Sequence, residues 1–263
     1  MPFTFAHPAA VLPLRSLRVV PIVFSALVIG SMAPDIVYFA PLSLDGDFTH
    51  SLAGLFLFCL PAGMLMYLLI MHGLRRPLSA LLPFGIARRL TPAAAAHGMT
   101  PLRRALAILL SLLLGAMTHV LWDALTHDDT VVTLQGEFWR WLTGDPVLQF
   151  AVYPVAQHVS SIAGIALLCM ALRTWIRSTP PDPGYREPVS PGLRRLAWAA
   201  MVGVASVAAL LAWRNGAAEP LSLRSFHAVV APIRWLAMSA LAWCATWHFA
   251  TLGFLRADAD PRR

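Results

Sequence analysis

The sequence predicts an all-α integral membrane protein, a polytopic helical bundle that crosses the bilayer about five times. Apolar residues make up 58% of the 263 residues and charged residues 13%, whereas soluble domains have roughly 45–50% and about 25%. The apolar residues gather in runs long enough to cross a bilayer, and no stretch has the charge density of a soluble domain. We therefore expect a single integral membrane domain over residues 1–263.

The segment Leu17–Ala40 is the first apolar stretch, and its course is ambiguous. Two prolines and Asp35 interrupt it, so it forms either a sixth crossing or a re-entrant or interfacial helical segment. A full crossing would leave His7 in the cytoplasm. A re-entrant or interfacial course would leave His7 on the outer side, together with Asp35 and His50, and we favour this course.

Five later runs have the length and composition of membrane-crossing helices. A helix over the first of them would be about 34 Å long, which exceeds the roughly 30 Å thickness of a hydrocarbon core. The predicted spans are Leu52–Leu74, Leu106–Leu125, Leu148–Leu172, Leu196–Trp213 and Trp235–Leu255. Five prolines between residues 180 and 191 mark a loop between the third and fourth spans.

The basic residues, all 20 of them Arg, predict the orientation of the spans. Arg clusters occupy the loops after the first and third spans and the C-terminal tail, which we expect in the cytoplasm. The loop Asp128–Val147 has four acidic residues against Arg140 and is expected outside. Because the Arg clusters lie between apolar runs, the net charge of +7 indicates orientation in a membrane and argues against nucleic-acid binding.

Three side chains of metal-binding type follow one face at the end of the second span. His119, Asp123 and His127 are four residues apart, so on a helix they turn only about 80° around the axis. Such a face is costly in lipid unless it meets the bundle interior, a water-filled cavity or a metal ion. The alternative is that these residues are merely solvated at the interface. Asp35 and His50 are expected on the same side, which favours a divalent-metal site.

A second polar set lies on the third span. Gln157, Ser160, Ser161 and Gly164 share one helix face. Small and hydrogen-bonding residues of this kind typically pack membrane helices together. The alternative is that Gln157 or Ser161 orients a metal ligand.

Five segments closely resemble a bacterial membrane family of unknown function, number 4184. They are Met1–Leu14, Ser25–Asp35, Thr49–Ser51, His119–Asp123 and Thr126–Thr130. The resemblance extends to about Gly164, so residues 1–164 hold the expected metal-site region. Residues 165–263 hold the end of the third span, the Pro-rich loop and the C-terminal helix pair. The family is distantly similar to membrane-bound metal-dependent hydrolases and, beyond them, to the zinc-dependent phospholipase C group.

The resemblance implies a set of metal ligands. The phospholipase group uses an early His, an Asp, a His and a His-x-x-x-Asp helix. The matching residues here are His7, Asp35, His50, His119 and Asp123. That group also has a later His-x-x-x-Glu pair, but here His158 is followed four positions on by Ile162. The resemblance therefore implies one or two divalent ions, with zinc expected, rather than three.

The sequence thus predicts a membrane-bound metal-dependent hydrolase that acts on a phosphoester or lipid-derived substrate at the outer face of a bacterial inner membrane. The metal would activate water, and Asp35, Asp123 or His127 could be the general base. The sequence has neither a Gly-x-Ser-x-Gly elbow nor a Gly-rich phosphate loop. The alternative is a non-catalytic carrier or structural partner with a vestigial or structural metal site. Transport would need polar residues across the midplane, and three spans show few.

Overall fold

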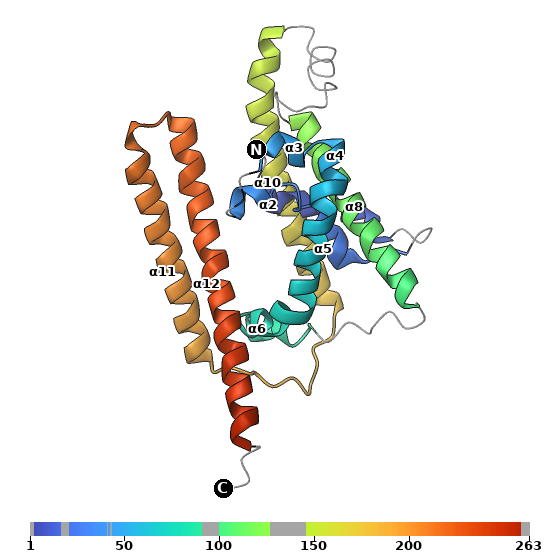
Figure 1. Ribbon diagram of the computed structural model, residues 1–263, viewed down its shortest axis with the longest axis vertical. Helices are drawn as coiled ribbons and strands as arrows, with labels where there is room; N and C mark the ends of the chain where they lie inside the picture. The colour runs from blue at the N-terminus through green and yellow to red at the C-terminus, as the bar shows by residue number, and fades with distance from the viewer. Residues whose placement is uncertain are drawn as a thin grey trace. The chain divides into compact units, whose positions relative to one another are not determined.

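The computed structural model of the protein consists of helices joined by loops (Figure 1). It describes residues 3–16, 21–40, 42, 44–90, 100–126 and 146–258, with backbone alone for residues 146–154 and 252–258. No strand occurs in these ranges, which confirms the predicted all-α class. Among the described residues, five helices are long and apolar enough to cross a membrane, as predicted: Leu52–Ala80, Pro101–Thr126, Val155–Ser178, Pro191–Ala218 and Leu221–Thr251.

The chain divides into two compact units, Met1–Leu68 with Ala94–Thr179 and Leu69–Ala93 with Pro180–Arg263. The first unit contains η1 (Thr4–Ala9), η2 (Pro13–Ser16), α1 (Phe24–Gly30), α2 (Ile36–Phe39), α3 (Gly46–Thr49), α4 (Leu52–Gly54), η3 (Leu55–Cys59), α5 (Leu60–Leu68), α8 (Pro101–Thr126) and α10 (Pro146–Ser178). The second contains η4 (Leu69–Leu74), α6 (Arg75–Ala80), α7 (Phe84–Ala87), α11 (Pro191–Asn215), η5 (Gly216–Ala218) and α12 (Leu221–Asp258).

The described part of Leu17–Ala40 holds two short helices, α1 with seven residues and α2 with four. A seven-residue helix is only about 10 Å long, so neither crosses a bilayer. Pro34 lies between them, where its missing N–H and fixed backbone angle interrupt helical hydrogen bonding. This agrees with the expected re-entrant or interfacial helical segment and argues against a single crossing helix. The interruption also places Asp35 directly before the first residue of α2.

The helices α1 and α8 pack closely because glycine lies on both sides of the contact. A Cβ atom on Gly30 would collide with the carbonyl oxygen of Leu112 on α8. A Cβ atom on Gly115 would likewise collide with the carbonyl oxygen of Leu27 on α1. Small residues allow membrane helices to approach in this way. The contact holds Ser31, at the end of α1, against the turn of α8 that carries His119.

The N-terminal helix η1 is held against α10. The backbone N–H of Phe3 donates to Oγ of Ser161 at 3.0 Å. A Cβ atom on Gly164 would lie only 3.0 Å from Cβ of Ala6, so the glycine lets η1 lie directly on α10. On the other side, Trp122 of α8 donates from its indole N–H to Oγ of Ser160 at 3.2 Å. The polar face of the third span therefore joins η1 and α8 to α10.

The second unit is built on the antiparallel hairpin of α11 and α12, joined by η5 (Figure 1). The sequence predicts that the fifth span begins at Trp235, but the helix begins at Leu221. Arg224 and Arg234 therefore lie within α12. The 38 residues of α12 make a helix of about 57 Å, longer than a hydrocarbon core. The guanidinium carbon of Arg224 lies 3.9 Å from the centroid of the Trp213 ring, a cation–π contact.

We expect Gly115→Ala to destabilise the first unit, because the added methyl group would meet the backbone of α1 rather than a movable side chain. Overpacking of this kind costs about 1–3 kcal/mol. The thermal unfolding midpoint of the detergent-solubilised protein should therefore fall. Gly203→Ala on α11 is the matched control, since nothing lies within 4 Å of an added Cβ atom there and Ala favours a helix over Gly. Equal midpoints for the two variants would contradict the close packing of α1 on α8.

Candidate metal centre

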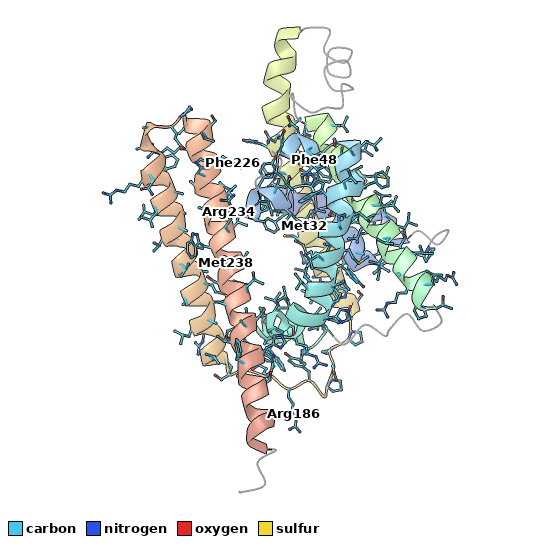
Figure 2. All side chains as sticks on the ribbon, viewed as in Figure 1. Met32, Phe48, Arg186, Phe226, Arg234 and Met238 are labelled. Carbon is cyan, nitrogen blue, oxygen red and sulfur yellow. The ribbon has the colours of Figure 1, made fainter. Side chains whose placement is uncertain are left out.

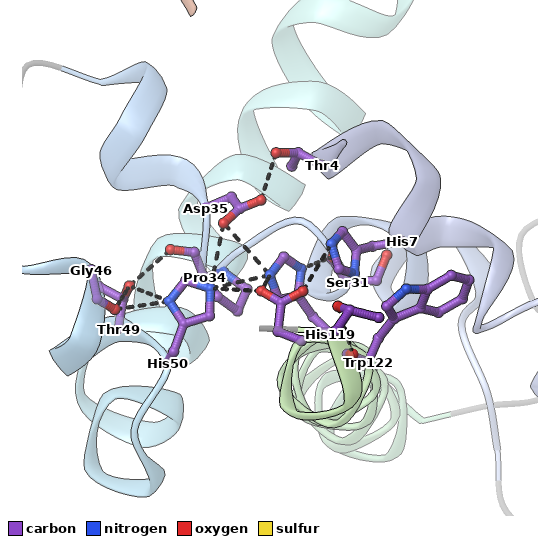
Figure 3. A network of polar contacts seen from close by, with 12 residues as sticks. Thr4, His7, Ser31, Pro34, Asp35, Gly46, Thr49, His50, His119 and Trp122 are labelled. Carbon is purple, nitrogen blue, oxygen red and sulfur yellow. Dashed lines mark hydrogen bonds and ion pairs between the residues drawn. The ribbon is translucent and has the colours of Figure 1, made fainter. Parts of the chain in front are cut away.

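Four side chains of metal-binding type meet in the first unit (Figure 3). Asp35 follows the break after α1, His50 ends α3, and His119 and Asp123 lie one turn apart on α8. One ligand atom from each of the four lies within 4.8 Å of the others. The side chains of Asp35, His119 and Asp123 are at most 5% exposed, and that of His50 is 11% exposed. The structure thus brings together four of the five ligands that the sequence predicted.

The distances from the two imidazole nitrogens to each other and to the two carboxylate oxygens suit a small metal ion. Nε2 of His119 lies 3.2 Å from Nε2 of His50, 3.5 Å from Oδ1 of Asp35 and 3.3 Å from Oδ2 of Asp123. Nε2 of His50 lies 3.4 Å from each of the same two oxygens. Ligand bonds of about 2.0–2.1 Å in a tetrahedron put neighbouring ligand atoms about 3.3–3.4 Å apart. The cluster could therefore hold a metal ion.

Backbone carbonyls fix the direction of both imidazole rings. Nδ1 of His119 donates to the carbonyl oxygen of Ser31 at 2.8 Å, and Nδ1 of His50 donates to that of Gly46 at 2.8 Å. A carbonyl only accepts, so the proton of a neutral ring lies on Nδ1 and the lone pair on Nε2. Metal-binding histidines typically have such a partner on the far nitrogen. Two lone pairs that face each other repel, and a cation between them removes the repulsion.

Each carboxylate presents one oxygen to the cluster and the other to η1. Oδ2 of Asp35 accepts a hydrogen bond from the hydroxyl of Thr4 at 2.5 Å. Oδ1 of Asp35 is buried, and among the described residues it accepts no hydrogen bond. Oδ1 of Asp123 lies 3.4 Å from Nε2 of His7. Because a 3₁₀-helix has three residues per turn, Thr4 and His7 share one face of η1 and restrain both carboxylates.

The remaining predicted ligand, His7, lies beside the group of four atoms rather than within it. Its ring stacks on that of His119, with centroids 3.7 Å apart and planes tilted by 19°. The ring of His7 also meets the edge of Trp122. Figure 3 shows His119 between His50 and His7. His7 is thus buried next to the cluster and contacts it through both His119 and Asp123.

The charges of the cluster are coupled. Burial by itself would raise the pKa of Asp35, but the neighbouring His119 and His50 hold it well below its usual range. Burial would lower the pKa of His50, but the carboxylates of Asp123 and Asp35 raise it to about 9. Two buried carboxylates require positive charge nearby. A divalent cation between the four side chains would match the two negative charges.

The family described as "Domain of unknown function (DUF4184)" matches residues 1–247. The chain belongs to the DUF4184 family. The match extends well past Gly164, where the resemblance was expected to end, and so takes in α11 and most of α12. No curated protein and no solved structure matches this DUF4184 chain. The expected similarity to hydrolases and phospholipases therefore remains an inference from the motif residues.

Three other predicted site residues, His127, Gln157 and Ser161, are not among the four clustered ligands of the DUF4184 chain. His127 lies outside the described residues. Gln157 accepts hydrogen bonds from Ser160 and Ser161 through its backbone carbonyl. Ser161 accepts a hydrogen bond from the backbone N–H of Phe3 and so holds the start of η1.

Several residues that support the site were not found from the sequence. Thr4 binds Asp35, and the backbone carbonyls of Ser31 and Gly46 orient the two imidazoles. A backbone carbonyl leaves no signal in the residue pattern. Thr4 could have been found from its spacing of three before His7, but only if a 3₁₀-helix had been assumed. Thr49 also supports the site, because its hydroxyl donates to the carbonyl of Pro34 and so joins α3 to the Asp35 segment.

We expect Thr4→Val to weaken divalent-metal binding by about tenfold or more, because residues that orient a ligand typically contribute 10–100-fold to affinity. The variant keeps the shape of the side chain but removes the hydroxyl that holds Oδ2 of Asp35. Competition with a chromophoric chelator for Co²⁺ or Zn²⁺ measures the change. The control is Thr174→Val on α10, whose hydroxyl bonds only within its own helix to Met170. Equal affinities for both variants would show that Thr4 does not restrain a ligand.

Proposed function

We propose that this DUF4184 protein is a metal-dependent hydrolase that acts on a phosphoester or lipid-derived substrate at the outer face of a bacterial inner membrane. The observation that carries the proposal is the buried group of two imidazole nitrogens and two carboxylate oxygens, which all lie within 4.8 Å of one another. Zinc is the ion proposed, because it accepts mixed His and Asp ligands in a tetrahedron. The position at the end of α8, a membrane-spanning helix, supports a substrate drawn from the lipid layer.

A divalent ion in this site would supply a Lewis acid that polarises a phosphoryl or carbonyl oxygen and lowers the pKa of water. The exposure of the ligand side chains indicates how a substrate could reach the ion. Asp35, His119 and Asp123 are buried almost completely, whereas the side chain of His50 is 11% exposed. Substrate would therefore approach past His50. Asp35 and Asp123 are restrained as ligands by η1, which favours His127 as the general base among the three candidates.

The proposal allows one or two ions. The first would take the four-atom cluster. A second would take Oδ1 of Asp123 and Nε2 of His7, with Asp123 shared between the ions. If only one ion binds, His7 restrains Asp123 instead.

A structural metal site is the second candidate, and one observation favours it. Four protein ligands fill a tetrahedron, as in structural zinc sites, whereas catalytic sites keep a position for water. A closed site would tie the Asp35 segment and α3 to α8 without reacting with any substrate. For hydrolysis the ion would have to take a fifth ligand or lose one of the four.

We expect the purified protein to contain at least one divalent ion per chain and the His119→Gln, Asp123→Asn double variant to contain almost none. The two substitutions remove one nitrogen and one charged oxygen from the cluster while keeping side-chain size. Elemental analysis of the detergent-solubilised protein measures the content. The matched control is His227→Gln with Asp182→Asn in the second unit, which should keep full metal content. Negligible metal in the folded wild type would remove the basis for both candidate functions.

The hydrolase and the structural site differ in what the metal-loaded protein does. The hydrolase should release product from a panel of phosphodiester and phospholipid substrates, and the double variant should lose at least 10²-fold in rate. The structural site should bind metal without turnover, and removing the metal should lower the unfolding midpoint. Metal-loaded protein without turnover on the whole panel would overturn the hydrolase and leave the structural site. Equal turnover in the wild type and the double variant would contradict the assignment of His119 and Asp123 to the metal site in both candidate functions.

The outer location of the site is tested by topology. A reporter enzyme active only outside the cytoplasm, fused after Asp129, should be active, because the acidic loop that follows α8 is expected outside. The same reporter fused after Arg89 should be inactive, because that loop is rich in Arg. The reverse pattern would place the metal site on the cytoplasmic side.

A further inference from the structure

The α11–α12 hairpin of the second unit contains a groove whose two ends differ in polarity. One part is a cavity of about 770 Å³, lined mainly by apolar side chains such as Val207, Leu211 and Trp235. The other part is a cavity of about 340 Å³ near η5, whose lining includes Glu219, His227 and Arg234. Both parts are lined by Ala212 and Ala231, so they adjoin. Both volumes fall within the range of ligand-binding pockets.

The apolar part is open along its length. Val207, Leu211 and Trp235 are each at least 50% exposed. An added Cβ atom on Gly203 would meet nothing within 4 Å, so the glycine leaves space in the groove that the protein does not fill. Both helices of the hairpin have the length and hydropathy of membrane spans. In a bilayer, an open apolar groove along such helices takes up an acyl chain.

The polar part holds charges of both signs. His227 and Arg234 are seven residues apart on α12 and therefore share one face of the helix. Arg234 lines this part together with Gly216 of η5 and with Glu219. Nδ1 of His227 lies 3.0 Å from Oε2 of Glu219. Figure 2 marks Phe226, which also lines this part, and Arg234 along α12.

We propose that this groove binds one zwitterionic phospholipid with an ethanolamine headgroup. Arg234 would bind the phosphate, because a guanidinium forms strong paired hydrogen bonds with phosphate oxygens. The carboxylate of Glu219 would bind the ammonium group, and one acyl chain would lie past Gly203 and Val207. A lipid with an anionic headgroup has no ammonium group that could bind the carboxylate of Glu219. Since every residue involved lies in the second unit, the lipid site does not depend on the metal centre.

The test is a titration of the full chain in mild detergent, followed by native mass spectrometry. The probes are phosphatidylethanolamine and phosphatidylglycerol with the same acyl chains. We expect one phosphatidylethanolamine per chain, bound about tenfold or more tightly than phosphatidylglycerol. Arg234→Gln should weaken phosphatidylethanolamine binding by about tenfold or more, as expected for loss of a hydrogen bond to a charged group. Gly203→Phe should abolish binding by filling the groove.

Two controls match these variants. Gly73→Phe adds the same side chain at another glycine whose added Cβ atom meets nothing within 4 Å. Arg186→Gln removes an exposed Arg from the Pro-rich loop (Figure 2). Both controls should bind lipid as the wild type does, and all four variants should keep their metal content. The metal measurement separates failure of this proposal from failure of the proposed hydrolase.

Three results would overturn the lipid site. The first is equal binding of the two lipids, which would show that Glu219 does not select the headgroup. The second is unchanged lipid binding by Gly203→Phe. The third is a dimer that carries no lipid and dissociates in Gly203→Phe, which would show that a second copy of the chain covers the groove.

Discussion

Two carboxylates, Asp35 and Asp123, are buried within a helical unit made largely of apolar side chains. A buried carboxylate without compensation is so costly that the protein would unfold or the group would take up a proton. The rest of the first unit supplies the compensation. His50 and His119 provide positive charge or ligand nitrogens on one side of the carboxylates, and η1 provides Thr4 and His7 on the other. The packing of α1, α8 and α10 therefore keeps these six side chains close to one another.

Glycine and small residues make that convergence possible. Gly30 and Gly115 bring α1 to α8, so that the Ser31 carbonyl reaches His119. Gly164 and Ser161 bring η1 to α10, so that Thr4 and His7 reach the carboxylates. Long side chains at these four positions would separate the elements. Small residues thus lie where the backbones of two elements approach each other beside the site.

The five spans could be predicted because a long apolar run can be recognised in the sequence without knowing which helices pack against it. The pair His119 and Asp123 could be predicted for a similar reason, since a spacing of four fixes one helix face. The predicted start of the fifth span, Trp235, is later than the start of α12 because Arg234 interrupts the apolar run. A long Arg side chain can nevertheless lie within such a helix, because it can lean along the helix to a polar region. Thr4 and the carbonyls that orient the imidazoles depend on contacts between distant segments. No local pattern encodes them.

The four ligands differ in how strongly the surrounding structure restrains their side chains. His119 and Asp123 lie on the long helix α8, and Asp35 is fixed by Thr4. His50 follows the four-residue helix α3 and has the most exposed side chain of the four. Its restraints are the carbonyl of Gly46 and the joint between Thr49 and Pro34. In the proposed hydrolase, which needs a position for water, His50 is therefore the ligand whose displacement would disturb the least packing. In the proposed structural site, the same exposure makes His50 the ligand through which an ion would enter and leave.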